Sequence, residues 1–360
     1  MEQTRLQKIA SMLKEMGADA VMLTSPVNRQ YAADFRSSAG VCLITQQGEG
    51  YFLTDFRYIE AAGKAVEQQG YQARMIKDNK YADAVNELME QHGVKTLVYE
   101  DKALSVTEFR QYEEQLKAEL IPLGGRLEKI RQIKEPKEVE HIVAAQRIAE
   151  QAFDQLLELI RPGVTEQRLA AELNYRMLCL GAQGMSFNII AVSGANSSMP
   201  HGVPTAKEVQ PGDFITFDFG ALVEGYHSDM TRTVAVDHVT DEMALVYDTV
   251  LQANKAGCQA IQAGLSGRDA HNIALDIIRA AGYGEYFAHG LGHCVGLEIH
   301  ESPRASLTSQ DVLETGNVIT VEPGIYLPGK FGVRIEDMIW ISPEGPVNLT
   351  RTPKELLILK

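Results

Sequence analysis

The feature that most constrains this chain is a nine-residue pattern that occurs twice in its C-terminal part. Residues 212–220 and 316–324 share the form G-x-x-I-T-x-[DE]-x-G at an offset of 104. Upstream, residues 162–165 and 263–266 match at an offset of 101, and each segment ends in a hydroxyl residue suited to a helix N-cap. A unit of about 100 residues is longer than a solenoid repeat. We therefore expect two related α+β halves packed about a pseudo-two-fold axis.

The whole chain has 360 residues, more than one hydrophobic core usually organises. Between residues 20 and 123, short apolar runs alternate with helical patterns such as Tyr58–Gln69 and Tyr81–His92, which predicts a small α/β domain. Pro136 stands where a helix can begin without losing a hydrogen bond. We therefore expect two domains, residues 1–128 and 129–360.

The net charge of the chain indicates which kinds of molecule it can bind. The chain has 34 Lys and Arg against 48 Asp and Glu, a formal net charge of −14, which disfavours binding to nucleic acid. It contains no apolar stretch of about 20 residues, so we expect no membrane span. Its four cysteines form no CxxC pair, which argues against a disulfide framework or a zinc finger: Cys42, Cys179, Cys258 and Cys294. Without a recognisable export signal, we expect a cytoplasmic protein with small molecules or peptides as partners.

Each copy of the repeat leads from one acidic residue to another across a predicted hairpin turn. The pairs are Asp218 with Asp229 and Glu322 with Glu336. Opposed residues of an antiparallel hairpin have a constant index sum, here 447 and 658, and both sums place the turn in turn-like sequence. Such pairing holds two acids about 5 Å apart on one strand face, where they repel each other unless a proton or a cation intervenes. Two pairs related by a two-fold axis would form a cluster of four carboxylates.

Histidines add imidazole donors to this cluster. Residues 289–300 contain His289, His293 and His300, and His201 follows Pro200. Three glycines in the same segment disfavour a helix, and the HExxH glutamate is absent, so we expect a glycine-rich strand or loop. Oxygen ligands with one or two imidazoles suit Mn²⁺, Co²⁺, Fe²⁺ or Zn²⁺, and bridging acids suggest two ions about 3.5 to 4 Å apart. P-loop, GxGxxG and GxSxG motifs are absent from the sequence.

These motifs together resemble the pita-bread metallopeptidases, in their aminopeptidase P and prolidase (Xaa-Pro peptidase) branch. The resemblance extends from about Ile133 to the C-terminus, and residues 53–58 resemble the creatinase-type N-terminal domain. It implies an α+β pita-bread catalytic domain of two pseudo-symmetric halves, preceded by a smaller α/β domain. The matching stretches are residues 200–202, 218–220, 225–233, 289–301, 321–324 and 333–337.

The resemblance also implies roles for individual residues. Two divalent metal ions, Mn²⁺ foremost, would be held by five ligands, with Asp229 and Glu336 bridging both ions. Glu322 would also act as general base and acid, and Arg334 would orient carboxylates. His289 and His300 would stabilise the tetrahedral intermediate or orient the substrate, and His201 would contact the scissile region. The ligand set carried over onto this sequence is Asp218, Asp229, His293, Glu322 and Glu336.

The implied activity is hydrolysis of the N-terminal Xaa-Pro bond of dipeptides or short peptides by a hydroxide that bridges the two metals, in a homodimer. Residues 34–38 depart from the loop of the family that approaches the partner's active site, which leaves the choice between dipeptides and longer peptides open. Arg36 in this loop could bind a dipeptide carboxylate or lie in solvent. The alternatives are a methionine-aminopeptidase-like enzyme, a metal-free creatinase-like enzyme and a non-catalytic binding protein on the same scaffold.

Overall fold

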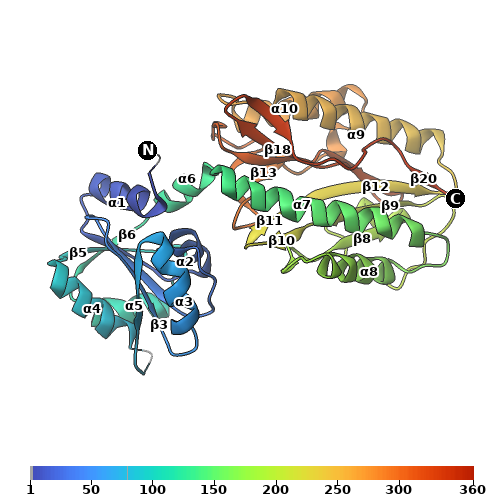
Figure 1. The fold of residues 1–360 in the computed structure, drawn as a ribbon. Coiled ribbons are helices and arrows are strands. Elements are labelled where there is room, and N and C mark those ends of the chain that lie inside the picture. Colours follow the sequence, from blue (N-terminus) through green and yellow to red (C-terminus); the bar gives the residue numbers. More distant parts are fainter. Residues whose placement is uncertain (1–2, 79) are drawn as a thin grey trace. The chain divides into compact units, whose positions relative to one another are not determined.

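The computed structural model describes residues 3–78 and 80–360, and the chain divides into two compact units, Met1–Arg131 and Gln132–Lys360. Helix α6 (Arg126–Gln132) ends at this division (Figure 1). The expected border after residue 128 lies three residues before this division, inside α6, which begins directly after Gly124 and Gly125.

The N-terminal unit is built on a mixed six-stranded sheet in the order β4-β3-β2-β1-β5-β6. Strand pairs β3–β4, β1–β5 and β5–β6 are parallel, and β1–β2 and β2–β3 are antiparallel. Every residue of β1, β2 and β3 is buried, which explains why these strands are continuous apolar runs in the sequence. The predicted α/β organisation is confirmed. Its strands are β1 (Ala20–Leu23), β2 (Val41–Thr45), β3 (Gly50–Thr54), β4 (Tyr71–Met75), β5 (Thr96–Tyr99) and β6 (Glu119–Pro122), and its other helices are α1 (Arg5–Met16), α2 (Pro26–Ala33), α3 (Ile59–Val66), α4 (Tyr81–His92) and α5 (Val106–Gln115).

The C-terminal unit contains two sheets of similar composition. One has the order β20-β12-β9-β8 and the other β14-β13-β15-β18-β19. Its helices are α7 (Pro136–Leu156), α8 (Glu166–Cys179), α9 (Asp241–Ala260) and α10 (Gly267–Ala280). Its strands are β7 (Gly184–Met185), β8 (Ile190–Ser193), β9 (Phe214–Phe219), β10 (Ala221–Val223), β11 (Tyr226–His227), β12 (Met230–Val236), β13 (Gly292–Cys294), β14 (Glu301–Ala305), β15 (Val318–Val321), β16 (Gly324–Leu327), β17 (Phe331–Arg334), β18 (Asp337–Ser342), β19 (Gly345–Asn348) and β20 (Ile358–Leu359).

The predicted repeat of two halves is confirmed by these elements. Strands β9 and β15 begin 104 residues apart, and helices α8 and α10 begin 101 residues apart. Thr165 and Ser266 cap α8 and α10, each accepting a hydrogen bond from a backbone N–H three residues later. Each capping residue also forms an isolated bridge, Thr165 with Glu208 and Ser266 with Val312. The two sequence copies therefore fold into equivalent helix and strand units.

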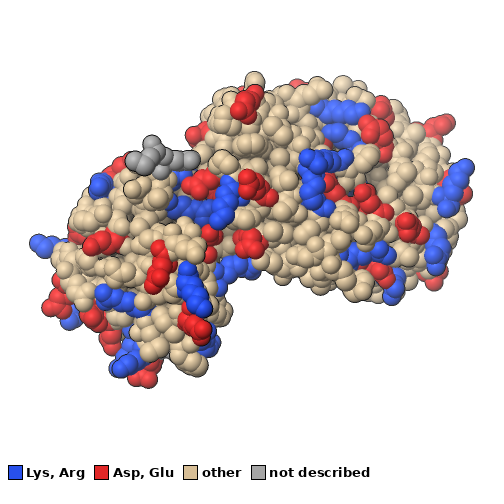
Figure 2. All heavy atoms as spheres, viewed as in Figure 1, with Lys and Arg blue, Asp and Glu red and all other residues tan. Residues whose placement is uncertain are grey.

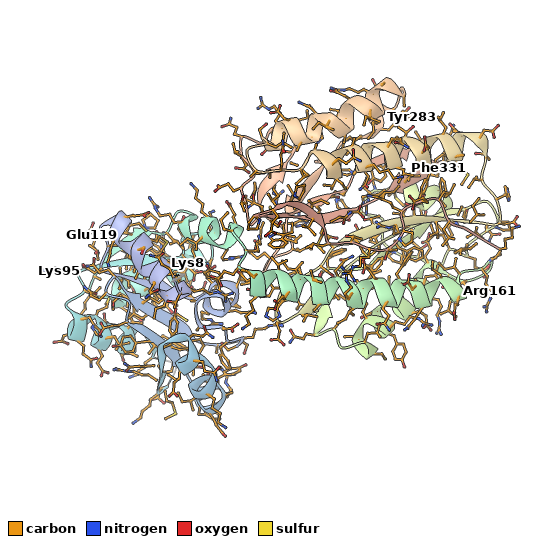
Figure 3. The ribbon with its side chains drawn as sticks, turned by 45° about the horizontal axis from the view of Figure 1, so that its top comes forward. Lys8, Lys95, Glu119, Arg161, Tyr283 and Phe331 are labelled. Carbon is orange, nitrogen blue, oxygen red and sulfur yellow. The ribbon has the colours of Figure 1, made fainter. Side chains whose placement is uncertain are left out.

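The two halves meet in a shared apolar core. Phe214 of β9 packs against Phe331 of β17 with ring centroids 5.5 Å apart and the rings nearly perpendicular. Figure 3 labels Phe331 on its strand. Pro136 occupies the first turn of α7, as predicted, and the apolar face of α7 is buried against the first half. This core holds the inner strands of both halves together, and the acidic residues lie at the ends of those strands.

One of the two expected hairpin registers is wrong. Asp218 lies opposite Thr231, not Asp229, so the index sum is 449 instead of 447. The reason is the turn between β10 and β11, where Glu224 and Gly225 have φ of 48° and 78° and form a two-residue loop of the primed type. Because side chains alternate with a period of two, Asp218 and Asp229 remain on one face despite this shift.

The other expected register is confirmed. Gly324 pairs with Arg334 in the β16–β17 hairpin, and Val321 pairs with Asp337 where β15 meets β18. Both pairs have the index sum of 658 that the sequence predicts. Glu322 and Glu336 lie between these two ladders, at positions with the same sum.

The surface carries charges of both signs. Figure 2 shows Lys and Arg interspersed with Asp and Glu on the visible face. Among the helices of the described residues, none is long and apolar enough to span a membrane.

Candidate metal centre

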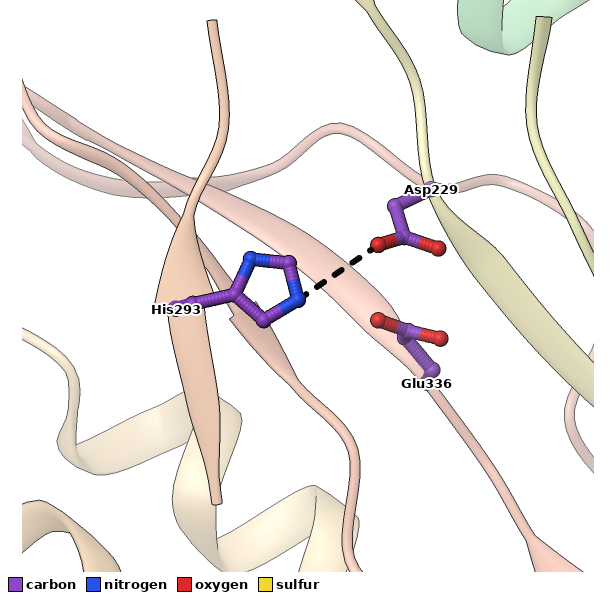
Figure 4. Close-up of side chains that lie close together, drawn as sticks. All are labelled: Asp229, His293 and Glu336. Atoms are coloured by element: carbon purple, nitrogen blue, oxygen red, sulfur yellow. Dashed lines mark ion pairs between the residues drawn. The ribbon is translucent and has the colours of Figure 1, made fainter. Parts of the chain in front are cut away.

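The side chains of Asp229, His293 and Glu336 point toward one another (Figure 4). One ligand atom from each lies within 4.8 Å of the others. Asp229 directly precedes β12, His293 lies in β13, and Glu336 lies between β17 and β18. The first half of the repeat thus supplies one carboxylate, Asp229. The second half supplies the other carboxylate, Glu336, and the imidazole of His293.

A glycine allows His293 to reach this position. A Cβ atom on Gly292 would lie 1.9 Å from the carbonyl oxygen of Thr320, so only glycine lets β13 approach β15 this closely. The backbone N–H of His293 donates to Thr320 Oγ1 at 3.1 Å. The segment around His293 is a short strand in a loop, as the glycines predict.

The hydrogen bonds of His293 determine which ring nitrogen faces the acids. Nδ1 lies 3.1 Å from the carbonyl oxygen of Cys294, which can only accept, so Nδ1 carries the proton. Burial lowers the pKa of His293 to about 4, so the ring is neutral at neutral pH. The Nε2 lone pair then points at the carboxylates, 3.7 Å from Asp229 Oδ2 and 3.5 Å from Glu322 Oε1. This is the tautomer that a metal ligand requires.

Asp218 and Glu322 border the same point. Asp218 Oδ2 accepts from Arg334 Nη2 at 2.6 Å, and Glu322 Oε1 accepts from Thr320 Oγ1 at 3.3 Å. The Asp218 carboxylate raises the pKa of Asp229, so the two acids are close enough to interact. We call Asp218, Asp229, Glu322 and Glu336 the acid cluster.

The acid cluster carries more negative charge than its surroundings balance. Burial raises the pKa of Asp229 and of Glu336 well above the usual range, and the neighbouring carboxylates raise both further. Burial also raises the pKa of Glu322 to about 8, although Arg334 opposes the shift. Four ionised carboxylates and one guanidinium sum to −3. Bound cations would relieve this repulsion and displace the protons.

Unpaired oxygens in the acid cluster fit such cations. Asp218 Oδ1 and Glu336 Oε1 are buried and have no hydrogen-bond partner among the described residues. Buried carboxylate oxygens without a donor are costly, and metal coordination is one of the few ways to satisfy them. Four carboxylates and one imidazole suit Mn²⁺, Fe²⁺, Co²⁺ or Zn²⁺. The residues therefore fit divalent cations.

Arg334 is a buried hydrogen-bond donor beside the acid cluster. It is 4% exposed, and besides Asp218 it donates through Nε to Thr231 Oγ1 at 3.1 Å and through Nη1 to the Tyr326 hydroxyl at 2.7 Å. The Tyr326 hydroxyl lies 3.0 Å from Nε2 of His289, whose Nδ1 donates to the carbonyl oxygen of Gly290. Because Nδ1 carries the proton, Tyr326 donates to Nε2. Both ring nitrogens of His289 are thus engaged.

His300 and His201 lie at the rim of the site. The ring of His300 packs edge-on against His293 with centroids 4.4 Å apart. His201 is exposed. Burial lowers the pKa values of His289 and His300, and the electrostatic interaction with His201 lowers both further, so the three histidines are neighbours. The structure therefore brings the candidate histidines together near the acid cluster.

Sequence reasoning missed three neutral residues of the site. Thr231 Oγ1 donates to Glu336 Oε2 at 2.7 Å, Thr320 donates to Glu322, and Tyr326 connects Arg334 to His289. Tyr326 could have been found from the index sum of 658. This sum pairs Arg334 with Gly324, so Glu322 and Tyr326, two residues to either side, are the diagonal neighbours of Arg334. No comparable signal marked the threonines, because threonine is common in strands.

Thr231 provides a test of this hydrogen-bond network. We expect Thr231→Val, which keeps the shape but removes the bond to Glu336, to weaken metal binding about 10- to 100-fold. The measurement is a titration of the metal-free protein with Mn²⁺. Thr249→Val on α9 is the matched control, since that hydroxyl donates to Leu245 of its own helix. Equal metal affinities in the two variants would contradict the role given to Thr231.

Comparisons with known proteins agree with this geometry. Residues 140–343 match the model of metallopeptidase family M24, and residues 5–133 match that of the creatinase/prolidase N-terminal domain. The chain belongs to metallopeptidase family M24. It is thus a metallopeptidase that depends on divalent metal, and the pita-bread fold implied by the sequence resemblance is confirmed.

Several relatives span the full length of the M24 chain. It is 35% identical over 98% of its length to a Xaa-Pro dipeptidase of Pyrococcus furiosus, of which 99% is covered. The structure of a Xaa-Pro dipeptidase from Bacillus anthracis superposes with a TM-score of 0.94 at 42% identity, covering 99% of both chains. The structure of an X-Pro aminopeptidase from Thermotoga maritima superposes with a TM-score of 0.91 at 33% identity, covering 97% of this chain and 99% of the other.

Proposed function

We propose that this M24 enzyme hydrolyses the bond between an N-terminal residue and a following proline in dipeptides or short peptides. The observation that carries the proposal is the buried acid cluster, which contains unpaired oxygens and brings Asp229 and Glu336 within 4.8 Å of a neutral imidazole. The names of the relatives, Xaa-Pro dipeptidase and X-Pro aminopeptidase, support the substrate class. The proposed ligands of two divalent ions are Asp218, Asp229, His293, Glu322 and Glu336.

The proposed metals are two Mn²⁺ ions, with Co²⁺, Fe²⁺ and Zn²⁺ as alternatives, because the donor set is four carboxylates and one imidazole. When bound, two such cations lower the pKa of a shared water so that hydroxide is available near neutral pH, and they polarise the scissile carbonyl. Asp229 and Glu336 are the proposed bridging ligands, as the family resemblance implies, and they bring ligand atoms within 4.8 Å of each other and of His293.

Glu322 is the proposed general base and acid. Its side chain is 18% exposed against 6% for Asp229, so it is the more accessible of the two to a substrate. The Thr320 hydroxyl orients one of its oxygens, which leaves the other to accept a proton and return it to the leaving nitrogen. Such a path requires no covalent enzyme intermediate.

The basic residues around the cluster divide into two groups. Arg334 orients Asp218, and His289, with both nitrogens engaged, supports the Tyr326 hydroxyl that contacts Arg334. His300 and His201 lie at the open rim and are the proposed substrate contacts, His300 at the tetrahedral intermediate and His201 at the scissile region.

A bond to proline suits a site of this kind. The Xaa-Pro bond is a tertiary amide without an N–H, so an enzyme that does not require a hydrogen bond from that nitrogen can cleave it. Catalysis by cations and carboxylates imposes no such requirement. The preference for proline itself comes from the relatives.

The decisive experiment compares purified enzyme in Mn²⁺ on an Xaa-Pro dipeptide, an Xaa-Pro-Xaa tripeptide and a Met-Ala peptide. We expect turnover of proline peptides, with the shorter preferred, and loss of activity on chelation. Preferred cleavage of Met-Ala would instead support a methionine-aminopeptidase-like enzyme. Failure to bind metal or turn over any peptide would support a binding protein.

Arg36 bears on the choice between dipeptides and longer peptides. If the enzyme is a homodimer, as the resemblance implies, the loop at residues 34–38 could place Arg36 against the C-terminal carboxylate of a dipeptide, which arginine binds bidentately. We expect Arg36→Ala to raise KM about tenfold for the dipeptide and not for its C-terminally amidated form. Equal, negligible effects on both substrates would remove Arg36 from the site.

A further inference from the structure

A buried glutamate outside the acid cluster underlies the loop that carries His201. Glu166 is the first residue of α8, and it has no exposed surface. One carboxylate oxygen accepts from the backbone N–H and hydroxyl of Ser193 at 2.7 and 3.0 Å. The other accepts from the backbone N–H and hydroxyl of Thr205 at 2.9 and 2.7 Å. Glu166 therefore ties together the two ends of residues 194–204, which we call the His201 loop.

The charge of Glu166 is stabilised without a direct cation partner among the described residues. Asn196, within the His201 loop, donates to both carboxylate oxygens at 3.1 and 3.2 Å. The carboxylate also lies at the N-terminus of α8, where the helix dipole favours negative charge. Several neutral donors converging on one buried anion define its geometry closely. The Glu166 carboxylate therefore fixes the positions of the segments that donate to it.

The second half of the internal repeat has no carboxylate at the position equivalent to Glu166. The equivalent position in the second half, 101 residues later, is Gly267 at the start of α10. A Cβ atom on Gly267 would lie 2.1 Å from the carbonyl oxygen of Arg304, so the backbone of β14 packs directly on that helix. The same fold is thus made without a carboxylate in one half. Glu166 belongs to the half that carries the His201 loop.

The other side of the His201 loop is attached to the strand that leads to the metal site. The backbone N–H of Gly332 in β17 donates to Ser197 Oγ at 2.9 Å. A Cβ atom on Gly332 would lie 2.1 Å from the Ser197 carbonyl oxygen, so the contact is close. Two residues further along β17, Arg334 donates to the Pro200 carbonyl oxygen at 3.3 Å as well as to Asp218.

We propose that Glu166 is a positioning residue for peptide hydrolysis, which holds the His201 loop against β17 so that His201 stands at the substrate. The proposal rests on the proposed function in one respect, the contact of His201 with the peptide. Without the carboxylate, Ser193 and Thr205 lose their common acceptor. The loop then keeps its contacts with Gly332 and Arg334 but loses the carboxylate that joins its two ends, so His201 is held less firmly.

The first test measures loop order independently of catalysis. Hydrogen exchange of residues 194–204 should be faster in Glu166→Ala than in the wild-type enzyme, with bound Mn²⁺ unchanged. Gln167→Ala is the matched control, because Gln167 is the exposed neighbour on the same helical turn. Glu166→Gln, which keeps one acceptor oxygen, should show a smaller increase, and it provides the measurement should the alanine variant not fold. Unchanged exchange in the loop would overturn the proposal.

The second test asks whether Glu166 acts through His201. A positioning error of about 1 Å can cost on the order of 10²-fold, so we expect losses of that size in kcat/KM for Glu166→Ala and for His201→Ala. The kcat/KM of the double variant should lie within about twofold of that of the less active single variant, because both changes remove the same contact. Multiplying losses would show that Glu166 does not act through His201.

The two tests separate this proposal from the proposed function. If the wild-type enzyme did not cleave Xaa-Pro peptides, the proposed function would fail, and the exchange measurement alone would still decide whether Glu166 orders the His201 loop. If the enzyme cleaved them and the double variant lost activity multiplicatively, the proposed function would stand and the role of Glu166 would fall.

Discussion

Replacing Glu322 by glutamine is expected to lower kcat by about 10² to 10⁴, with the fold retained. The amide can still coordinate a cation through its oxygen and can still accept from the Thr320 hydroxyl. It cannot take up the proton and return it to the leaving nitrogen. The measurement is kcat on an Xaa-Pro dipeptide at saturating Mn²⁺, together with the metal content of the same sample by elemental analysis.

The metal content decides how a loss of rate is interpreted. Glu344→Gln, an exposed glutamate in the turn between β18 and β19, is the matched control and should retain full activity. A large loss of kcat with normal metal content in Glu322→Gln assigns proton transfer to Glu322. Near-normal kcat with metal bound would assign the general base to another residue.

The repeat made most of the catalytic fold predictable. A pattern at a fixed offset specifies that two segments fold alike, and the N-caps Thr165 and Ser266 fixed where the equivalent helices begin. The index sum of 658 was correct because Gly329 is the centre of the β16–β17 turn, and the β15–β18 ladder keeps the same register. Local sequence is sufficient where the turn residues are located correctly.

The sum of 447 failed because the turn is centred between Glu224 and Gly225, one position later than expected. Between Asp218 and Asp229 the chain leaves β9, forms the β10–β11 hairpin and returns as β12. The turn at Glu224-Gly225 sets the register, and an acidic residue followed by glycine is a recognisable signal for it. The error was two residues, so it left both acids on the predicted face.

Buried polar partners could not be predicted in this way. Glu166 and Thr205 are 39 residues apart in the chain, and Arg334 and Pro200 are 134 apart. No periodicity links residues at such separations, because their contact depends on how the sheets pack. Sequence reasoning identified the carboxylates, the histidines and Arg334 of the site, whereas the structure was needed to find the neutral residues that orient them.

The same division explains why the acid cluster was the easiest part of the site to find. Four carboxylates on otherwise apolar strands are conspicuous, since burial of a charge without a partner is costly. Burial and the neighbouring carboxylates raise the pKa values of Asp229 and Glu336, so these acids destabilise the metal-free protein. Bound cations would remove the repulsion. The metal-free and metal-bound proteins should therefore differ measurably in stability.

Replacing Asp229 by asparagine is expected to weaken metal binding at least about 10²-fold without destabilising the metal-free protein, because Asp229 is a proposed ligand to both ions. Asparagine has the same shape as aspartate and removes one of the charges that repel Glu336. The metal-free variant should thus be as stable as the wild type or more so. Mn²⁺ at 100 times the wild-type Kd should stabilise the wild type by about 2.7 kcal/mol and the variant far less.

The measurement for Asp229→Asn is the thermal midpoint with and without Mn²⁺, combined with elemental analysis. Asp248→Asn, at an exposed position on α9, is the matched control and should keep the full metal-induced shift. Since the charge is changed identically in both variants, a difference between them reports on position and not on net charge. Wild-type metal content and activity in Asp229→Asn would remove Asp229 from the ligand set, and the bridging role would then have to be met by Glu336 with Asp218 or Glu322.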